Sequence, residues 1–496
     1  MRDLITSPNW RDSDLGLPLP DSGHAVSVAM PRWRDVVDYE EGEARVLSAL
    51  SCGYPRFVIH PLVARLNHHI AQEQATSTEV VFSFPSAGVA RRARLYLKRR
   101  DGAESRVVET GFGEIHALIC EADHFDTVKS YWQHSGEIVS SRCAEQALTD
   151  EPVPRAAGLQ AKNALRTQIA ALAGVDAGDV LLFPTGMAAI TFAHRVTGAL
   201  LPGVASCQLG FPYVDTLKVQ EKLGQGVVFL PRGDASDMQA LADALGKGEV
   251  ASVFTECPAN PLLTTVDLER VAVMCRTRRA PLVVDVTLDC FANLNPFPHA
   301  DIAVVSLTKY FSGVGDVMGG ALVLNPQSDL YRVLRGHCDH FFEDLLYAGD
   351  AVVLQQYGAD FSERFARVNE TAARLCARLV AHEKVAAVHY PALTCRETYT
   401  RFCRRPNPGY GGLFSIELVD GAENAPLFYD RLEVCKGPSL GTNFTLACPY
   451  TLLAHYHELD WAATCGVNAH LIRVSVGLES FDALWARFEA ALATLP

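Results

Sequence analysis

Length, composition and charge are those of an ordinary soluble protein with more than one domain. The chain has 496 residues, of which 49% are hydrophobic and 20% charged, enough to bury large cores in two or three domains. The formal net charge of -13 argues against nucleic acid or an anionic membrane surface as a partner. No apolar run approaches the roughly 18 residues that span a bilayer, and residues 1–10 lack the apolar core of a signal peptide. We therefore expect a cytoplasmic protein.

The 14 cysteines are scattered along the chain without a CxxC pair. Many of them, such as Cys120, Cys376 and Cys435, stand in apolar contexts, which predicts reduced and mostly buried thiols rather than disulfides or a zinc site. We expect no metal site. The glycine-rich run at residues 313–320 has Met318 where a dinucleotide-binding fingerprint requires its third glycine, so that cofactor class is not expected either.

Residues 1–135 predict a small α/β unit ahead of the rest of the fold. Strands are predicted near EVVFSFP, SRVVET and EIHALICEA, and helices near GVARRARLYLKRR and DHFDTVKSYWQH. Before them, residues 16–33 contain proline and glycine without a regular period. That run predicts an extended segment docked on another part of the protein.

Residues 136–365 predict a large domain built around a mostly parallel sheet. Apolar runs such as GVVFLPRGD, SVFTECPANP, PLVVDVTLD, IAVVSLTK and ALVLN alternate with helical patterns such as TTVDLERVAVMCRTRR. This alternation is typical of an α/β fold whose helices cover both faces of the sheet. Near its start, Thr185, Gly186 and Met187 form a turn between a strand and a helix, where free backbone N–H groups can bind a phosphate.

Ser306, Thr308 and Lys309 stand at the end of one of these strands, where α/β sheets bind their ligands. A lysine between hydroxyls and before a glycine-rich turn suits an aldehyde cofactor that carries a phosphate, and pyridoxal phosphate is the obvious candidate. Asp285 ends the strand before it, so its carboxylate can reach the same edge and keep the pyridine nitrogen protonated. A lone lysine there is usually a surface residue and a lone aspartate usually caps a turn, but the pair is more specific.

Residues 366–496 predict a smaller carboxyl-terminal α/β domain. A helical pattern over residues 352–385 leads into it. Strands are predicted near GLFSIEL, RLEVCKG and LIRVSVGL, followed by the helix SFDALWARFEAALATL.

Six motifs, in this order, resemble the cystathionine γ-synthase group of pyridoxal-phosphate enzymes, the Cys/Met metabolism family: PTGMAAI, ECPANPLL, VVDVT, SLTKYFSG, PSLGTNFTL and LIRVSVGLES. Ahead of them, HAVSVAMPRW, YEEGEARV, GYPRF and GEIVSSR resemble the longer cystathionine γ-synthases of fungi. The resemblance implies fold type I of the PLP-dependent transferases, with a large sheet domain, a smaller carboxyl-terminal domain and an amino-terminal extension.

The resemblance also implies which residues meet the cofactor. Lys309 would bind it covalently and then carry protons, while Asp285 would pair with the ring nitrogen, close to Thr287. Tyr213 would stack on the ring and help in proton transfer, since a planar electron-poor ring favours stacking. Asn260 would lie near the phenolic oxygen.

Other matching residues would hold the phosphate and the substrate. The phosphate ligands implied are Gly186, Met187, Ser306 and Thr308. Arg473 would bind the substrate carboxylate, because a guanidinium can make two parallel hydrogen bonds to it. Ser439 lies in the loop beside the substrate.

Three places depart from the family's pattern. Relatives commonly have a Tyr-x-Arg pair that reaches the phosphate of the neighbouring subunit, but here Ser140 replaces the tyrosine and Arg142 alone would keep the contact. Residues 314–316 read Val-Gly-Asp where a histidine and an aspartate are usual, and Pro438 replaces an acid before the SLG loop. The last two changes bear on substrate choice.

The activity implied is γ-replacement on an O-acylhomoserine, with the acetyl ester suggested by the fungal resemblance and L-cysteine as the thiol that gives cystathionine. Sulfide or a carbon nucleophile remains open as the acceptor, and so does a non-catalytic relative that keeps the fold as a regulatory module. The resemblance implies a homodimer or homotetramer with shared active sites, to which Arg142 would contribute across the interface.

Overall fold

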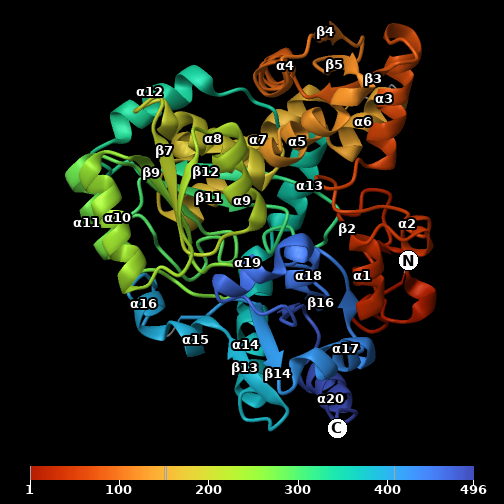
Figure 1. Cartoon of the computed structure of the whole chain (residues 1–496), viewed down its shortest axis with the longest axis vertical. Helices are drawn as coiled ribbons and strands as arrows, with labels where there is room; N and C mark the ends of the chain where they lie inside the picture. The colour runs from red at the N-terminus through yellow and green to blue at the C-terminus, as the bar shows by residue number, and fades with distance from the viewer. Residues whose placement is uncertain (1, 150, 152, 407) are drawn as a thin grey trace.

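The computed structural model describes residues 2–149, 151, 153–406 and 408–496. Figure 1 shows the amino-terminal α/β unit at the top right, the large sheet with its helices in the middle, and a smaller sheet below, towards the carboxyl terminus. None of the helices in these residues is long and apolar enough to cross a membrane. The architecture is the α/β fold that the sequence predicts.

The large sheet has seven strands in the order β6-β12-β11-β10-β9-β7-β8. Neighbouring strands are parallel except where β12 pairs with β6 and β11. The strands are β6 Val180–Phe183, β7 Ala205–Leu209, β8 Val227–Leu230, β9 Val250–Glu256, β10 Leu282–Asp285, β11 Ile302–Ser306 and β12 Gly320–Leu324. The sheet is therefore mostly parallel, as expected from its apolar runs.

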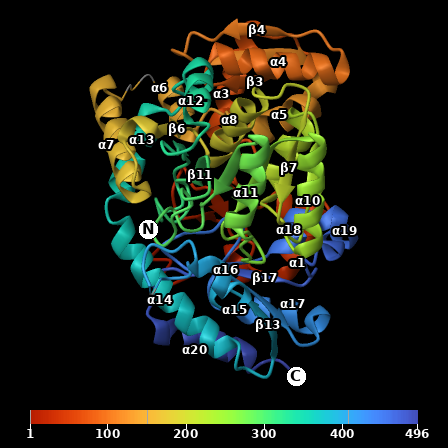
Figure 2. The same cartoon turned by 90° about the vertical axis from the view of Figure 1, so that its left-hand side faces the viewer.

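Helices cover both faces of this sheet (Figures 1 and 2). Alternate residues of β11 show the two faces: Ile302 and Val304 join a hydrophobic cluster with helix α8, and Ala303 and Val305 join another with α10 and α11. The helices around the sheet are α7 Arg155–Ala173, α8 Gly186–Gly198, α9 Val214–Lys218, α10 Ala235–Lys247, α11 Leu268–Arg278, α12 Tyr331–Phe341 and α13 Ala348–Gly358.

One edge of the sheet collects polar groups. Glu256 ends β9, Asp285 ends β10 and Ser306 ends β11, and the register pairs Asp285 with Glu256. Helix α8 starts beside them after β6, where the Thr185 hydroxyl accepts a hydrogen bond from the Ala188 N–H and so caps the helix. Carboxyl ends of parallel strands and the start of α8 thus meet at the same edge.

The carboxyl-terminal part forms a five-stranded sheet in the order β13-β14-β17-β16-β15. Its strands are β13 Val385–His389, β14 Leu413–Leu418, β15 Cys435–Lys436, β16 Leu446–Pro449 and β17 Ile472–Ser475. Its helices are α14 Phe361–Leu379, α15 Pro391–Thr394, α16 Arg396–Thr400, α17 Gly421–Arg431, α18 Tyr450–His455, α19 Leu459–Thr464 and α20 Phe481–Leu492.

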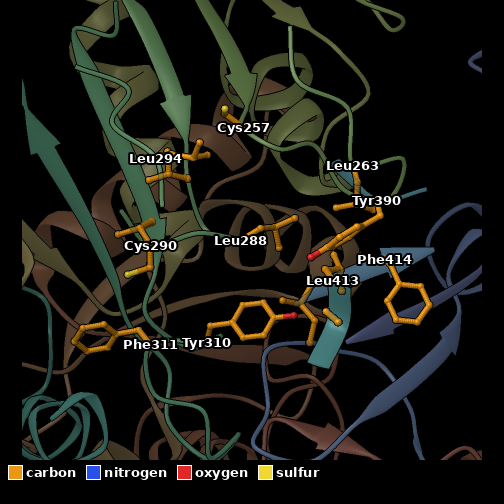
Figure 3. Packing of buried hydrophobic residues seen from close by; sticks show 14 of the residues in the cluster. Cys257, Leu263, Leu288, Cys290, Leu294, Tyr310, Phe311, Tyr390, Leu413 and Phe414 are labelled. Atoms are coloured by element: carbon orange, nitrogen blue, oxygen red, sulfur yellow. The ribbon is translucent and has the colours of Figure 1, made fainter. Parts of the chain in front are cut away.

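This sheet shares one hydrophobic core with the large domain. Figure 3 shows Leu288 and Tyr310 on the large-domain side of that core, close to Leu413 and Tyr390 of the carboxyl-terminal part. The Tyr310 hydroxyl also lies 3.1 Å from the hydroxyl of Ser475 on β17. Because Tyr310 directly follows Lys309, this packing fixes the lysine loop against the strand that carries Arg473.

The amino-terminal unit has two parts. Its three-stranded antiparallel sheet has the order β3-β5-β4 and its own hydrophobic clusters. Its elements are β1 Pro18–Leu19, β2 Ser27–Val28, α1 Trp33–Glu40, α2 Ala44–Leu47, α3 Pro61–Gln74, β3 Glu79–Phe84, α4 Ala87–Asp101, β4 Arg106–Glu109, β5 His116–Glu121, α5 Phe125–Ser135 and α6 Ser141–Thr149. The strands and helices that the sequence predicts here are present.

The residues before α3, which we call the amino-terminal segment (residues 2–58), run along the carboxyl-terminal sheet instead. The Met30 N–H donates to the Lys436 carbonyl at 2.9 Å, and the Tyr429 hydroxyl donates to the Met30 carbonyl at 2.9 Å. Lys436 Nζ donates to the Pro31 carbonyl at 3.1 Å. The part of it for which the irregular sequence predicts docking, residues 16–33, is docked at Met30 and Pro31.

The predicted domain ranges 1–135, 136–365 and 366–496 stay predictions. Helix α14 runs across the second boundary, and the amino-terminal segment packs on the last range although it belongs to the first.

The docking of the amino-terminal segment depends on a glycine. A Cβ on Gly437 would lie 2.1 Å from the Val28 carbonyl oxygen, a backbone atom that cannot move without displacing β2. We expect Gly437→Ala to lower the free energy of unfolding by about 1–3 kcal/mol and to make residues 2–58 more sensitive to protease. Urea unfolding and limited proteolysis measure the two effects.

The matched control is Gly336→Ala in α12, where nothing lies within 4 Å of the added Cβ. That change should leave stability unchanged or raise it by up to about 1 kcal/mol. Equal stability of the two variants would contradict the proposed contact.

Candidate active site

A cavity of about 510 Å³ opens at the polar edge of the large sheet. Its walls come from that edge, from the loop at Ser439 and strand β17, and from the amino-terminal segment. All the site residues that the sequence predicts line it except Thr308 and Arg142. Those brought together are Gly186, Met187, Tyr213, Asn260, Asp285, Thr287, Ser306, Lys309, Ser439 and Arg473.

Thr308 and Arg142 lie outside this cavity. Thr308 is buried, and its hydroxyl accepts a hydrogen bond from the Gly319 N–H at 3.1 Å. Arg142 donates to the Asp316 carbonyl at 2.6 Å and pairs with the carboxylates of Asp316 and Asp350 at 3.3 and 3.6 Å. The phosphate contacts suggested for both residues stay predictions.

The start of α8 offers a site for a phosphate. The side chain of Thr185 satisfies the Ala188 N–H, which leaves the N–H groups of Gly186 and Met187 free at the helix end. Ser306 faces the same corner from β11. An anion there would also gain from the partial positive charge of the helix N-terminus.

Two carboxyl groups meet beneath the cavity. Asp285 Oδ1 accepts a hydrogen bond from the Thr287 N–H at 2.7 Å, and burial raises the pKa of Asp285 to about 6. Glu256 accepts from the N–H groups of Tyr213 and Asn260 at 2.7 and 3.0 Å. Burial, followed by the neighbouring Asp285, raises the pKa of Glu256 to about 8. Near neutral pH Asp285 is thus the ionised member of the pair.

The amine of Lys309 lies between two hydroxyl groups. Its Nζ is 3.1 Å from Ser439 Oγ and 3.3 Å from the Tyr54 hydroxyl, and it stands over the Tyr54 ring at 4.5 Å from the centroid. Burial lowers the pKa of Lys309, and the neighbouring Tyr54 partly opposes that shift. The lysine therefore reaches its neutral, nucleophilic form more readily than an exposed lysine does.

Tyr213 is held by a buried ion pair. Its hydroxyl accepts a hydrogen bond from the guanidinium of Arg56 and lies 3.4 Å from Asp215 Oδ2. Arg56 and Asp215 pair at 2.6 Å, both almost fully buried, and His134 donates to Asp215 from the other side at 2.9 Å. Burial raises the pKa of Tyr213 well above its ordinary value.

Arg473 is positioned by neutral neighbours. It donates to Asn260 Oδ1 at 3.2 Å and to the Ser439 carbonyl at 2.7 Å, and stands over the Tyr450 ring at 4.9 Å. Ser439 has φ 91°, a strained backbone conformation for a residue with a side chain, which these contacts maintain. The arrangement can bind a small carboxylate inside the cavity.

Two residues of the amino-terminal segment, Tyr54 and Arg56, belong to the site although no role was assigned to them from the sequence. They stand in the run GYPRF, which shows no helical or strand period. The available signal was the run itself, an arginine flanked by aromatic residues in an irregular stretch. Glu256 and Tyr450, at the end of β9 and the start of α18, also line the cavity without having been predicted.

Pyridoxal phosphate fits these residues. The start of α8 with Ser306 can hold the phosphate, Asp285 can pair with the ring nitrogen, and Lys309 can bond the aldehyde carbon. The fit depends on Gly186, because a Cβ there would lie 2.6 Å from Ser306 Cβ and fill the phosphate corner.

Known proteins share this arrangement of segments. Residues 155–493 match the family model of the Cys/Met metabolism PLP-dependent enzymes, and residues 62–140 match that of the fungal trans-sulfuration enzyme N-terminal domain. A cystathionine gamma-synthase of Neurospora crassa is 34% identical, covering 97% of this chain and 98% of its own. The cystathionine gamma-synthase-like enzyme iboG2 of Amanita muscaria is also 34% identical, covering 96% of each chain.

Among solved structures, that of cystathionine gamma synthase from Xanthomonas oryzae pv. oryzae in complex with cystathionine is 26% identical. It superposes with a TM-score of 0.60 over 69% of this chain and 88% of the other. The cofactor of this chain is pyridoxal phosphate.

The raised pKa of Asp285, about 6, predicts how cofactor binding depends on pH. The ionised carboxylate favours a protonated ring nitrogen, so affinity should be full above pH 6 and fall as pH drops through that value. Below it, each pH unit should cost up to about tenfold in the dissociation constant. Titration of cofactor-free protein with pyridoxal phosphate between pH 5 and 8 measures this.

Asp285→Asn is the matched control, since the cofactor's own phosphate titrates equally with both proteins. The variant should bind more weakly at pH 8 and show a shallower loss towards pH 5. Parallel pH curves for the two proteins would contradict the role of Asp285.

Proposed function

The chain belongs to the Cys/Met metabolism family of PLP-dependent enzymes, and from this premise we propose that it catalyses γ-replacement on an O-acylhomoserine. The acyl group proposed is acetyl, the acceptor is L-cysteine and the product is cystathionine. The observation that carries the proposal is that Lys309, Asp285 and Arg473 face one cavity. A carboxylate-binding arginine beside the lysine suits an amino-acid substrate, and argues against a regulatory module that has lost catalysis.

The bound cofactor would supply an electron sink for negative charge at the substrate Cα. Arg473 would orient the amino acid by its carboxylate. Lys309 would remove the Cα proton and release it to solvent, which makes the amine a base again, and would then remove one proton from Cβ. The Cγ–O bond breaks and acetate leaves with the bonding pair. The cysteine sulfur then forms the Cγ–S bond and its proton goes to solvent. Lys309 returns its proton to Cβ, takes one proton back from solvent and delivers it to Cα.

Cysteine as the acceptor is supported by the Neurospora crassa relative, a cystathionine gamma-synthase. A second candidate is an acceptor without a carboxylate, either sulfide or an apolar carbon nucleophile. The lining of the cavity favours it, because it includes a group of apolar side chains, most of them from the amino-terminal segment. They are Val28, Met30, Leu50, Phe57, Val58, Leu453 and Ala454.

The charged groups around the cavity also favour an acceptor without a carboxylate. Arg56 is paired with Asp215, and Lys218 is paired with Glu221 at 3.1 Å. Among the buried cations described here, Arg473 is the one best placed for a carboxylate, and the donor amino acid takes it. The Amanita muscaria relative, a cystathionine gamma-synthase-like enzyme, is as similar in sequence as the cystathionine gamma-synthase of Neurospora crassa.

We further propose a homodimer or homotetramer in the cytoplasm, which acts on small amino acids. The reducing compartment is supported by the cysteines, all of which lie in the described residues as free thiols. Arg142 would reach a neighbouring subunit's phosphate after releasing Asp316 and Asp350.

Product analysis tests the reaction. The holoenzyme is incubated with O-acetylhomoserine and, in parallel, with cysteine, sulfide or a β-keto ester, and products are identified by mass spectrometry. We expect cystathionine from the cysteine reaction. A product with the β-keto ester alone would replace the cysteine assignment by the second candidate, and no consumption of O-acetylhomoserine with any acceptor would refute γ-replacement.

Arg473→Lys should weaken donor binding more than it slows the chemistry. A lysine keeps the charge but loses one of two parallel hydrogen bonds, each worth about 1.5–3 kcal/mol with a charged partner. We expect KM for O-acetylhomoserine to rise about 10- to 100-fold, measured by steady-state kinetics. Arg487→Lys in α20, away from the cavity, should leave KM unchanged, and a KM that also stays unchanged in Arg473→Lys would exclude the carboxylate contact.

A further inference from the structure

We propose that His455 is a catalytic residue, whose ring nitrogen Nε2 takes the proton of the acceptor as the acceptor attacks Cγ. The inference rests on the proposed function, because it assigns the base for the second half of that γ-replacement. It adds a group at the end of α18 to which the sequence assigned no role. An acceptor that must lose a proton, whether a thiol or a carbon acid, uses the same nitrogen.

His455 lines the cavity with one ring nitrogen bound and the other without a partner. The residue is only 3% exposed, and its Nδ1 lies 2.8 Å from Glu458 Oε1. Because a carboxylate only accepts hydrogen bonds, Nδ1 carries the proton in the neutral ring and Nε2 carries the lone pair. Nε2 has no hydrogen-bond partner in the part of the chain that the structure describes. The ring is thus a base whose proton must come from a ligand.

An unpaired nitrogen is costly in a histidine that only fills a core. A buried polar atom without a partner costs about 1–3 kcal/mol, so buried side chains normally have their polar atoms satisfied. The Tyr450 hydroxyl, at the other end of α18, is also buried and has no partner among the described residues. Tyr450 and His455 both line the cavity. One bound ligand with polar atoms can satisfy both groups.

The position of His455 suits the acceptor rather than the donor. Arg473 stands over the Tyr450 ring at 4.9 Å, and the ring centroids of Tyr450 and His455 are 6.1 Å apart. One ring therefore separates His455 from the group proposed for the donor carboxylate. Phe211 and Trp461 pack against the imidazole with centroid distances of 5.2 and 5.6 Å, which holds its plane in place.

Two other histidines of the described residues line the cavity, and neither is equally suited to this role. His134 has both nitrogens engaged, Nδ1 with Asp215 at 2.9 Å and Nε2 with Lys222 Nζ at 3.1 Å. His457 is exposed, so water competes with an acceptor for its nitrogens. His455 alone combines burial with an open nitrogen.

The proton transfer balances without any other reactant. Burial lowers the pKa of His455, Glu458 partly opposes that shift, and the charge of Lys218 adds to it, so the imidazole is neutral near pH 7. As sulfur forms the Cγ–S bond, the S–H bond breaks, its electron pair stays on sulfur and its proton moves to Nε2. The Glu458 carboxylate stabilises the imidazolium, which then passes the proton to solvent.

The first experiment measures the His455 imidazole without turnover. In the holoenzyme, exchange of the ring C2 hydrogen for deuterium is followed against pH by peptide mass spectrometry with fragmentation. The inflection of His455 should lie below the ordinary histidine value of about 6.5. Glu458→Gln should lower it by about one further pH unit, because the carboxylate that favours the imidazolium is lost. His337 in α12 is the internal control and should not change.

An inflection of His455 that stayed in place in Glu458→Gln would remove the dyad and overturn the proposal. An inflection at or above the ordinary histidine value in the wild-type protein would do the same, since the ring would then be largely protonated when the acceptor arrives.

The second experiment separates the acceptor's proton from activation of the donor. Incubation with O-acetylhomoserine alone in deuterated water reports exchange at Cα, which is the work of Lys309. His455→Gln should leave that exchange rate unchanged and lower kcat/KM for cysteine about 100-fold at pH 7. The loss should shrink as pH rises past about 8.5, where cysteine is a thiolate and needs no base. His337→Gln is the control and should change neither rate.

Glu458→Gln serves as a second variant in case His455→Gln does not fold, and should show the same pH trend with a loss of about tenfold. A loss that was equal at every pH, or that slowed Cα exchange to the same extent, would mean a structural role and overturn the proposal. Failure of the proposed function would look different, because the wild-type protein would then consume no O-acetylhomoserine with any acceptor.

Discussion

The site depends on the buried amine of Lys309, which has no carboxylate partner in the described residues. Within the described residues, Lys309 has hydroxyl and aromatic partners and forms no ion pair. Those partners come from residues 54 and 439, near opposite ends of the chain. The amino-terminal segment and the Ser439 loop must therefore both close on the large sheet before the lysine acquires its environment. Docking of Met30 on Lys436 and packing of Tyr310 against Ser475 achieve that closure.

At the same edge of the sheet, two carboxyl groups lie side by side. Asp285 and Glu256 occupy neighbouring strand ends in register, where burial raises the pKa of both carboxyl groups and the neighbouring Asp285 raises the pKa of Glu256 further. The backbone N–H groups of Tyr213 and Asn260 bind Glu256 and so tie two cavity walls to it. Glu256 thus holds the cavity walls together, and Asp285 remains available to pair with a cofactor nitrogen.

The central strands of the large sheet and the site residues at their ends could be predicted from the sequence, because each depends on a short local pattern. β10 and β11 are apolar up to their last residue and β9 is mostly apolar, so the polar groups at their ends reach the cavity by the geometry of parallel strands. β7, in contrast, was missed, since Ser206 and Gln208 interrupt its apolar pattern. Both are buried, and both are satisfied by Gln220, a partner that the pattern of a strand does not reveal.

Tyr54 and Arg56 could not be placed for a related reason. Their partners Lys309 and Asp215 lie far along the chain, and no period in an irregular run encodes so distant a contact. Thr308 and Arg142 illustrate the opposite case. Family resemblance suggests phosphate contacts for them, which stay predictions; within this chain their polar groups bind Gly319, Asp316 and Asp350.

The outer wall of the cavity comes from a segment that lies outside the large sheet and its helices. Val28, Met30, Leu50 and Phe57 line the cavity from this segment, whereas Lys309 and Asp285 stand at the edge of the large sheet. The space for the incoming nucleophile is thus formed in part by a different segment of the chain from the groups that activate the donor. Substitutions in that segment can therefore alter the space for the acceptor without replacing the residues that would bind the cofactor.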